Sequence, residues 1–299
     1  MKSRRSKWSV VGWVLGGIVG VMALVVGFAV VSSKLRLSKH YEARVRDVPA
    51  VDGPEALLEG KRLFVSRGCG DCHGEHGQGK VVMDAPPGRI VGTNLTRYAA
   101  EARSIDFVRA IRNGLARDGR PLVLMPSHEL RGLNDDEIGR IVAYVRRLPR
   151  VDTDLPETQV RPLGNALHVF GLFPLLAAEH IDHSEDVKSF AAREANAAYG
   201  QTLAAGCTGC HGAGLSGGRI PGAPAEMGVP ANLTPHATGL AKWSESDFVR
   251  VMREGVTPAG RQIDPKQMPW PAFSQMNDTE LGAIFAYLKT LPPKEVGNR

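Results

Sequence analysis

The sequence predicts a mainly α-helical protein, in which one N-terminal transmembrane helix precedes two small helical domains of similar sequence. Three observations support this fold class. An uncharged apolar run covers residues 10–31. A set of short motifs then occurs twice in the same order. Apolar residues recur at helical spacing, and no run alternates with the period of two that is typical of a half-buried strand, so we expect no substantial sheet.

The apolar run is long enough for a membrane span. As a helix with a rise of about 1.5 Å per residue, residues 10–31 would extend roughly 33 Å, which covers the hydrocarbon core of a bilayer. A cleaved signal peptide is the alternative, but its apolar region is usually about 7–15 residues long. We therefore expect residues 1–34 to form a retained membrane anchor.

The net charge of +6 does not indicate a nucleic-acid partner. Residues 1–46 carry nine Lys or Arg and one Glu, so the remainder, with 28 basic and 30 acidic residues, is nearly neutral. The positive charge thus flanks the apolar run. Because no basic stripe with interleaved aromatic residues is present, we expect no binding to nucleic acid.

The internal repeat defines the predicted domains. The motif at 69–73 returns at 207–211, and "GTNLT" at 92–96 returns as "PANLT" at 230–234, both 138 residues later. The other pairs are "DFVRAIRNG" (106–114) with "DFVRVMREG" (247–255), "LMPSHEL" (124–130) with "QMPWPAF" (267–273), and "NDDEIGRIVAYVRRLP" (134–149) with "NDTELGAIFAYLKTLP" (277–292). A duplication of this kind predicts domains at 50–150 and 184–293, joined by a linker at 151–183.

Each domain is expected to begin with a helix before its cysteine pair, at 54–68 and 184–206. Pro54 suits the first turn of such a helix. After each pair, at 74–103 and 212–242, the Gly- and Pro-rich sequence predicts a loop.

A short helix then follows in each domain. Ser104 can cap the first of these helices and Gly114 can end it, while Ser244 or Ser246 and Gly255 can do the same in the second domain. The last helices start at Asn134 and Asn277, because an acid three residues later, Glu137 or Glu280, completes a capping box in each. Each of these helices ends at Leu-Pro.

The linker contains an apolar stretch, 163–181, that is too short and too interrupted for a clean membrane span. We expect it to pack across the two domains as interdomain core. The alternative is a docking surface for another subunit.

All four cysteines of the chain fall into two Cys-x-x-Cys-His motifs. Such a pair of thiols can form a disulfide, half of a zinc site, a thioredoxin-like site or a haem attachment, and the adjacent histidine is the distinctive addition of the last. Zinc pairs usually lie about 15–20 residues apart, and a thioredoxin site needs a βαβ setting. We therefore predict two covalently bound haem c groups. The thioethers would come from Cys69, Cys72, Cys207 and Cys210, and the axial imidazoles from His73 and His211.

The sixth ligand decides whether such a centre carries electrons or binds a small molecule. Met125 and Met268 occupy equivalent places in the repeat, each followed by proline, so they are the predicted axial ligands. The alternatives are ordinary packing for both residues, and His128 as ligand in the first domain. Other residues of these types lack a partner in the repeat: Met83, Met227, Met252, Met276, His76, His168, His180, His183 and His236.

Covalent haem attachment also predicts the compartment. In bacteria the attachment machinery acts outside the cytoplasmic membrane. We therefore expect a single-pass protein of the cell inner membrane, with its N-terminus inside and both haem domains on the periplasmic side.

The segment from "NLTPHATGL" through "DFVRVMREG" and "QMPWPAF" to "AYLKTLPP" resembles the class I-like cytochrome c domains of membrane-bound cytochrome subunits in bacterial periplasmic dehydrogenases, such as alcohol and sugar dehydrogenase complexes. The resemblance covers about residues 54–293. It implies an electron carrier, not an enzyme, that accepts electrons from a periplasmic dehydrogenase subunit and passes them to a downstream quinone, cytochrome or oxidase of the respiratory chain. The alternatives are a haem enzyme, either a dihaem peroxidase or a thiosulfate-type oxidoreductase, and a cytochrome subunit of a haem-copper oxidase.

Overall fold

The computed structural model describes residues 7–187, 190–221, 223 and 226–299, so residues 1–6 of the predicted anchor lie outside it. In chain order the first elements are α1 (Lys7–Leu37), α2 (Pro54–Ser66), α3 (Cys69–His73), β1 (Lys80–Ala85), β2 (Gly88–Gly92), α4 (Leu95–Glu101), α5 (Ser104–Asn113), α6 (Ser127–Leu130) and α7 (Asp135–Arg147). They are followed by β3 (Gln159–Val160), α8 (Pro162–Val169), the 3₁₀ turn η1 (Ala177–His180), α9 (Ala197–Ala204), the 3₁₀ turn η2 (Ala205–Cys207), α10 (Thr208–His211), α11 (Glu245–Glu254), α12 (Trp270–Phe273) and α13 (Asp278–Thr290).

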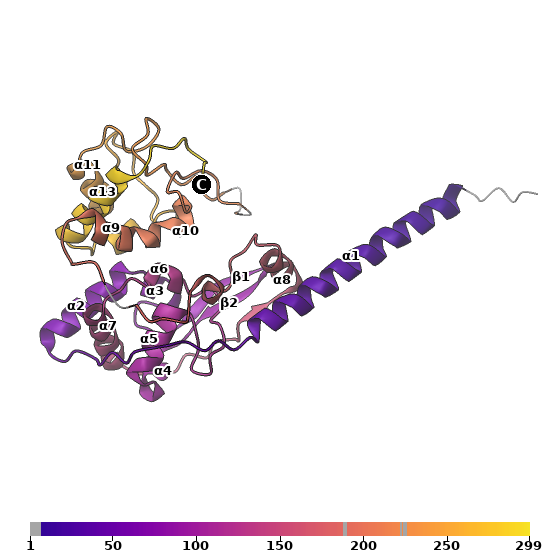
Figure 1. The fold of residues 1–299 in the computed structure, drawn as a ribbon, viewed down its shortest axis with the longest axis horizontal. Helices are drawn as coiled ribbons and strands as arrows, with labels where there is room; N and C mark the ends of the chain where they lie inside the picture. The colour runs from indigo at the N-terminus through magenta and orange to yellow at the C-terminus, as the bar shows by residue number, and fades with distance from the viewer. Residues whose placement is uncertain (1–6, 188–189, 222, 224–225) are drawn as a thin grey trace, which may run out of the picture.

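The N-terminal helix α1 projects from the body of the molecule as a long rod (Figure 1). Its segment Val10–Leu37 is long and apolar enough to cross a membrane by length and composition, and almost none of it is buried against the rest of the chain. The expectation of one N-terminal candidate transmembrane helix is therefore confirmed.

The body consists of two helical units, each with its own hydrophobic core. In Figure 1 the second unit, in orange and yellow, lies beside the first, in purple and magenta. In the first unit α2 packs along α7, and in the second α9 packs along α13. The mainly α-helical fold class predicted from the repeat is thus confirmed.

Each of these helix pairs meets at a glycine. A Cβ atom on Gly60 would overlap the backbone carbonyl of Arg140, and a Cβ atom on Gly200 would overlap that of Ala283. Tyr144 and Tyr287 are equivalent in the repeat. Their Cβ atoms would lie 2.9 Å and 2.8 Å from the Cβ atoms added to Gly60 and Gly200, respectively. Only glycine permits so close an approach of two backbones. These two glycines were not predicted from the sequence, because Gly60 lies nine residues before Cys69 and Gly200 seven before Cys207, so the spacing of the repeat does not align them.

The predicted helix ends are mostly observed. The side chains of Asn134 and Asn277 accept hydrogen bonds from the backbone N–H groups of Glu137 and Glu280, whose carboxylates accept in return. Ser244 caps α11 in the same way. The prediction for Ser104 is wrong by one residue: Ser104 is the first helical residue of α5, and the carboxylate of Asp106 accepts from the backbone N–H of Arg103 instead.

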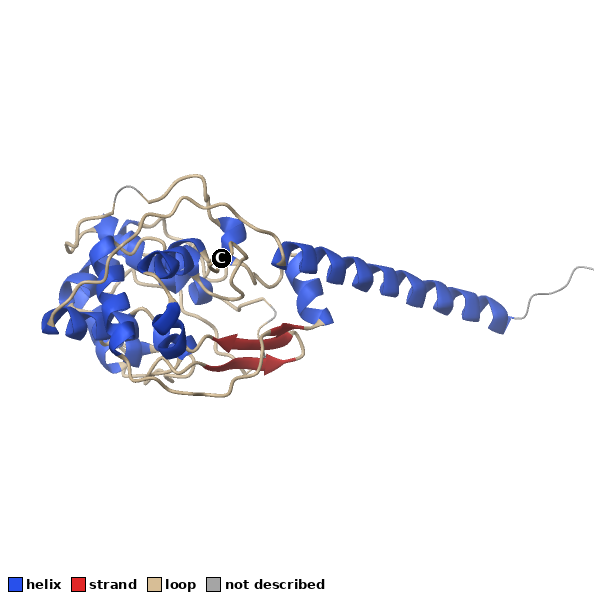
Figure 2. Cartoon of the chain, turned by 90° about the horizontal axis from the view of Figure 1, so that it is seen from below, coloured by secondary structure: helices blue, strands red, loops and turns tan. Residues whose placement is uncertain are grey.

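The prediction of a plain loop at 74–103, with no substantial sheet, is wrong for the first unit. Strands β1 and β2 form an antiparallel hairpin around Pro86 and Pro87, and β3 from the linker pairs with β2 to complete a three-stranded sheet. Figure 2 shows this sheet on the side of the body from which α1 leaves. In β1 a bulge between Val81 and Met83 interrupts the period, and β2, whose burial does alternate, has only three residues between its terminal glycines.

The prediction of a long helix at 184–206 is also wrong. The helix begins only at Ala197, and the residues between 184 and 196 that the structure describes are irregular. The linker behaves differently from the expectation as well. Its helix α8 packs against α1. Leu175–Ala178 are buried beside the loop that carries Met125, the methionine loop of the first unit. In this loop the N–H of Leu124 donates a hydrogen bond to the carbonyl of Leu175. The apolar stretch thus covers the first unit and α1 instead of forming interdomain core.

Candidate haem-binding sites

The first motif forms the five-residue helix α3, which starts directly after Gly68. Gly68 has φ +72°, a left-handed conformation that glycine adopts readily, and it separates α3 from α2. Residues three apart on a helix lie on one face, so Cys69 and Cys72 are neighbours, with His73 following at once. In the second unit η2 and α10 place Cys207, Cys210 and His211 in the same order.

Both motif histidines are held in one tautomer by a backbone carbonyl. Nδ1 of His73 lies 2.8 Å from the carbonyl oxygen of Thr93, and Nδ1 of His211 lies 2.7 Å from that of Ala231. A carbonyl only accepts, so Nδ1 carries the proton and Nε2 keeps the lone pair that a metal needs. Burial lowers the pKa of both histidines, which favours this neutral form.

The two carbonyl groups occupy equivalent positions, because Thr93 and Ala231 are separated by the same 138 residues as the two histidines. The repeated "NLT" segment that follows each of them was recognised in the sequence, but this contact was not predicted. The partner is a backbone atom, so its side chain gives no chemical clue, and only the constant spacing could have indicated it.

The four cysteines are free thiols in the structure. Burial raises the pKa of Cys69 and of Cys207 to about 12, so both are neutral thiols at physiological pH. Two adjacent free thiols and one unprotonated imidazole nitrogen form the donor set that a covalently bound haem requires. The residues present in each unit therefore fit the group.

The two methionine loops share one backbone conformation. Pro126 has φ −81° and ψ 52°, and Pro269 has φ −77° and ψ 53°. The carbonyl of Met125 accepts from the N–H of Ser127 at 2.8 Å, and the carbonyl of Met268 accepts from that of Trp270 at 2.7 Å.

Each methionine side chain packs on the core of its own unit. Met125 contacts the core cluster that Cys69 also contacts, and Met268 contacts the cluster that Cys207 contacts. The structure thus brings each predicted methionine to the core that supports its own motif.

The other methionines and histidines that could serve as iron ligands have different surroundings. Met252 and Met276 are buried within the core of the second unit. His128 is 43% exposed on α6, with its Nε2 atom 3.7 Å from Oε1 of Glu129. His168 and His183 are buried in hydrogen bonds, the first to Ser33 and the second to the carbonyl of Ala178.

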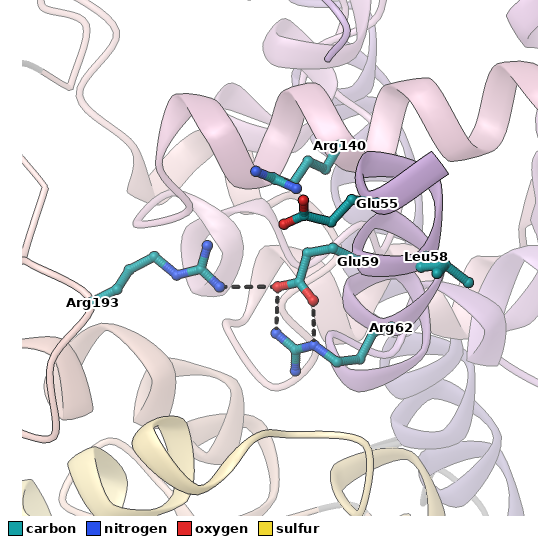
Figure 3. A pocket seen from close by; sticks show the side chains of 6 residues that line it. All are labelled: Glu55, Leu58, Glu59, Arg62, Arg140 and Arg193. Carbon is teal, nitrogen blue, oxygen red and sulfur yellow. Dashed lines mark hydrogen bonds and ion pairs between the residues drawn. The ribbon is translucent and has the colours of Figure 1, made fainter. Parts of the chain in front are cut away.

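Charged side chains join the two units close to the first motif. Arg67, two residues before Cys69, contacts both Glu137 of its own unit and Glu280 of the second. Beside them is an open pocket, in which Glu59 of α2 accepts hydrogen bonds from Arg62 and from Arg193, which precedes α9 (Figure 3). Its other lining residues are Glu55, Leu58 and Arg140. A lining so rich in ion pairs fits a contact that fixes the two units.

The second motif also faces the first unit. A Cβ atom on Gly209 would lie 3.1 Å from Oε1 of Glu129, which belongs to the methionine loop region of the first unit. Burial, followed by the charge of Glu129, raises the pKa of both Cys207 and Cys210. The second motif thus has a residue of the first unit as a neighbour, while contact with the second unit near the first motif is made by Arg67, just before it.

Comparison with known proteins gives consistent results. The chain is 27% identical to a nicotinate dehydrogenase subunit of Pseudomonas putida, over 97% of this chain and 25% of that protein. It is also 27% identical to the cytochrome c subunit of a quinone-dependent alcohol dehydrogenase of Gluconobacter oxydans, over 94% of this chain and 60% of the relative. A shorter match, 30% identical over 29% of the chain, is to the cytochrome subunit of a fructose dehydrogenase of Gluconobacter japonicus. The chain therefore spans less than two thirds of the length of these relatives.

The family model for cytochrome c matches the chain twice, at residues 57–149 and 197–292, and the two matches together cover more than half of the chain. Both matches contain one Cys-x-x-Cys-His motif, the carbonyl that orients its histidine and one Met-Pro loop. The chain belongs to the cytochrome c family.

Proposed function

We propose that this protein is a membrane-anchored dihaem cytochrome that accepts electrons from a periplasmic dehydrogenase and passes them to the respiratory chain. The observation that supports it most strongly is the duplicated histidine geometry, since two imidazoles oriented by equivalent carbonyls point to two centres of the same kind. Relatives whose names include cytochrome subunits of alcohol and fructose dehydrogenases support the dehydrogenase as electron donor.

In this proposal each unit holds one haem c, whose iron supplies one-electron redox chemistry when bound. Cys69 and Cys72 would attach the first group, and His73 and Met125 would ligate its iron. Cys207, Cys210, His211 and Met268 would do the same in the second unit. Methionine–histidine ligation favours a high potential and leaves no open position for a substrate, which suits an electron carrier.

The proposed location is the bacterial inner membrane, with α1 as a single span and both units on the periplasmic side. The length and composition of α1 support the span. A quinone, a second cytochrome or an oxidase in the same membrane would receive the electrons.

The ligands are tested by replacing each loop methionine with leucine, which keeps the volume and removes the sulfur. Met125→Leu and Met268→Leu should each remove half of the weak long-wavelength ferric band of iron–thioether ligation. Each should also lower one midpoint potential by roughly 0.1–0.3 V, within the range of about 0.8 V that axial ligands control. Met252→Leu, in the core of the second unit, is the control and should change neither. An unchanged band in a loop variant would exclude that methionine as ligand.

The donor is tested by purifying the untagged complex from membranes in mild detergent. A flavin or quinoprotein dehydrogenase should accompany the cytochrome, and addition of its substrate should reduce both haems. Recovery with a haem-copper oxidase, and no reduction by any dehydrogenase substrate, would place the protein in the other class of complex.

A further inference from the structure

Helix α8 is fixed to the end of α1 by its polar residues. His168 is buried, with its Nδ1 atom 3.1 Å from Oγ of Ser33 and its Nε2 atom 3.3 Å from Oε2 of Glu179. Glu179 in turn pairs with the guanidinium of Arg36. These contacts are made by the last turns of α1, so α8 cannot move independently of that helix.

The opposite face of α8 is apolar and turned outward. Leu163, Leu167 and Phe170 follow one another at the i, i+4, i+7 spacing of a single helix face. Leu163 is 48% exposed and Phe170 58% exposed, and Leu172, just past the turn at Gly171, is 60% exposed. An amphipathic helix that buries its histidine and presents leucine and phenylalanine to the outside has the orientation expected next to an apolar phase.

The position of α8 along α1 indicates that this apolar phase is the lipid bilayer. From Val10 to Ala29 an α-helix rises about 30 Å, which is the thickness of the hydrocarbon core. Ala29 and Ser33 are the residues of α1 that become buried where α8 packs. Figure 1 shows α8 beside the end of α1 that joins the body. Exposed Lys34 and Lys39 follow at the level expected for lipid headgroups.

We propose that Leu163, Phe170 and Leu172 form a membrane-contact surface that enters the outer headgroup region of the bilayer. This inference rests on the proposed membrane span of α1. The surface would hold the first unit at a fixed orientation to the membrane, because a chain of close contacts links it to the first motif. Gly164 of α8 packs on the carbonyl of Pro87 at the tip of the β1–β2 hairpin, and Gly92 at the other end of that hairpin packs on the carbonyl of Cys72.

The test uses the full-length, haem-loaded protein in vesicles of phosphatidylcholine and phosphatidylglycerol, with no other protein present. Single cysteines are introduced as Phe170→Cys or Leu172→Cys and labelled with a nitroxide, since the native cysteines are consumed by haem. Leu24→Cys, 74% exposed on α1, is the lipid reference, and Val229→Cys, 61% exposed in the second unit, is the water reference. Collision with oxygen and with a water-soluble nickel chelate is measured at each label.

The ratio of oxygen to nickel accessibility at Phe170 and Leu172 should be several-fold above that at Val229 and below that at Leu24. If Leu24 is in lipid while Phe170 and Leu172 match Val229, the membrane-contact surface is wrong and the anchor stands. If Leu24 itself matches Val229, the membrane span and this inference both fail.

Discussion

Arg67 of the first unit donates a hydrogen bond from Nη2 to Oε1 of Glu280 in the second unit, at 2.5 Å. The same nitrogen lies 3.1 Å from Oε1 of Glu137, the residue that occupies the place of Glu280 in the first repeat. All three side chains are almost fully buried. Two equivalent helix-capping carboxylates thus meet at one guanidinium, two residues before the first haem motif.

Removing this guanidinium should destabilise the contact between the units. Arg67→Met leaves Glu137 and Glu280 buried with one cation fewer, and breaking a buried pair in this way costs about 3–5 kcal/mol. We expect denaturant unfolding of the haem-loaded protein in detergent to lose a comparable free energy, with the two units unfolding less cooperatively. Arg150→Met removes the exposed pair with Asp152 and should change stability by less than about 0.5 kcal/mol.

A double-mutant cycle isolates the pair. If Arg67 acts through Glu280, then Glu280→Gln should cost less in the Arg67→Met background than in the wild type, since the two losses share one interaction. Strictly additive losses would show that the two side chains stabilise the protein independently.

The same cluster predicts a sensitivity to acid. Burial alone raises the pKa of Glu280, but the hydrogen bond from Arg62 and the charge of Arg67 outweigh it and hold this pKa at about 2. A carboxyl with a lowered pKa stabilises the folded state above its ordinary pKa and loses that contribution as the pH falls. Unfolding free energy should therefore fall by up to about 3 kcal/mol between roughly pH 4.5 and pH 2. In Glu280→Gln, the decrease over this interval should be smaller by a similar amount.

Glu129 predicts a pH dependence of the second centre. Burial raises the pKa of Glu129 to about 7, and its carboxylate faces Gly209 in the second motif. Ionisation places a negative charge there, which stabilises the oxidised form. The midpoint potential of the second haem should therefore fall by tens of millivolts as the pH rises through about 7, in a spectroelectrochemical titration. Glu129→Gln should abolish this pH dependence of the midpoint potential. The control Glu254→Gln, at the exposed end of α11, should retain it. If the midpoint potential of Glu129→Gln still falls as the pH rises, another group is responsible for the dependence.

The local features of the fold could be predicted because their causes are local. The capping boxes at Asn134 and Asn277 need only four consecutive residues each, and the repeat made both visible. The Cys-x-x-Cys-His motifs are likewise complete within five residues. The helix that begins at Ala197 is shorter than predicted. The alanine-rich residues before it favour a helix by propensity alone, but those that the structure describes are irregular.

Features that depend on distant residues could not be predicted. Arg67 and Glu280 are 213 positions apart, and neither residue has a sequence context that indicates the other. Strand β3 consists of two residues that pair only because the linker returns to the hairpin. The carbonyl groups that orient His73 and His211 belong to the backbone, so residue type carries no information about them.

The last prediction concerns the glycine crossings. In an isolated helix alanine is favoured over glycine by about 1 kcal/mol, so propensity alone would make Gly200→Ala stabilising. The added Cβ atom would instead overlap the carbonyl of Ala283, and relieving that overlap by moving α9 away from α13 typically costs about 1–3 kcal/mol or more. We therefore expect Gly200→Ala, and Gly60→Ala in the first unit, to lower the unfolding free energy of the haem-loaded protein. Gly206→Ala, in η2, is the matched control, because no atom of the residues that the structure describes lies within 4 Å of its added Cβ. A Gly200→Ala variant as stable as the control would mean that α9 and α13 do not cross at backbone contact, and that the glycine is present for another reason.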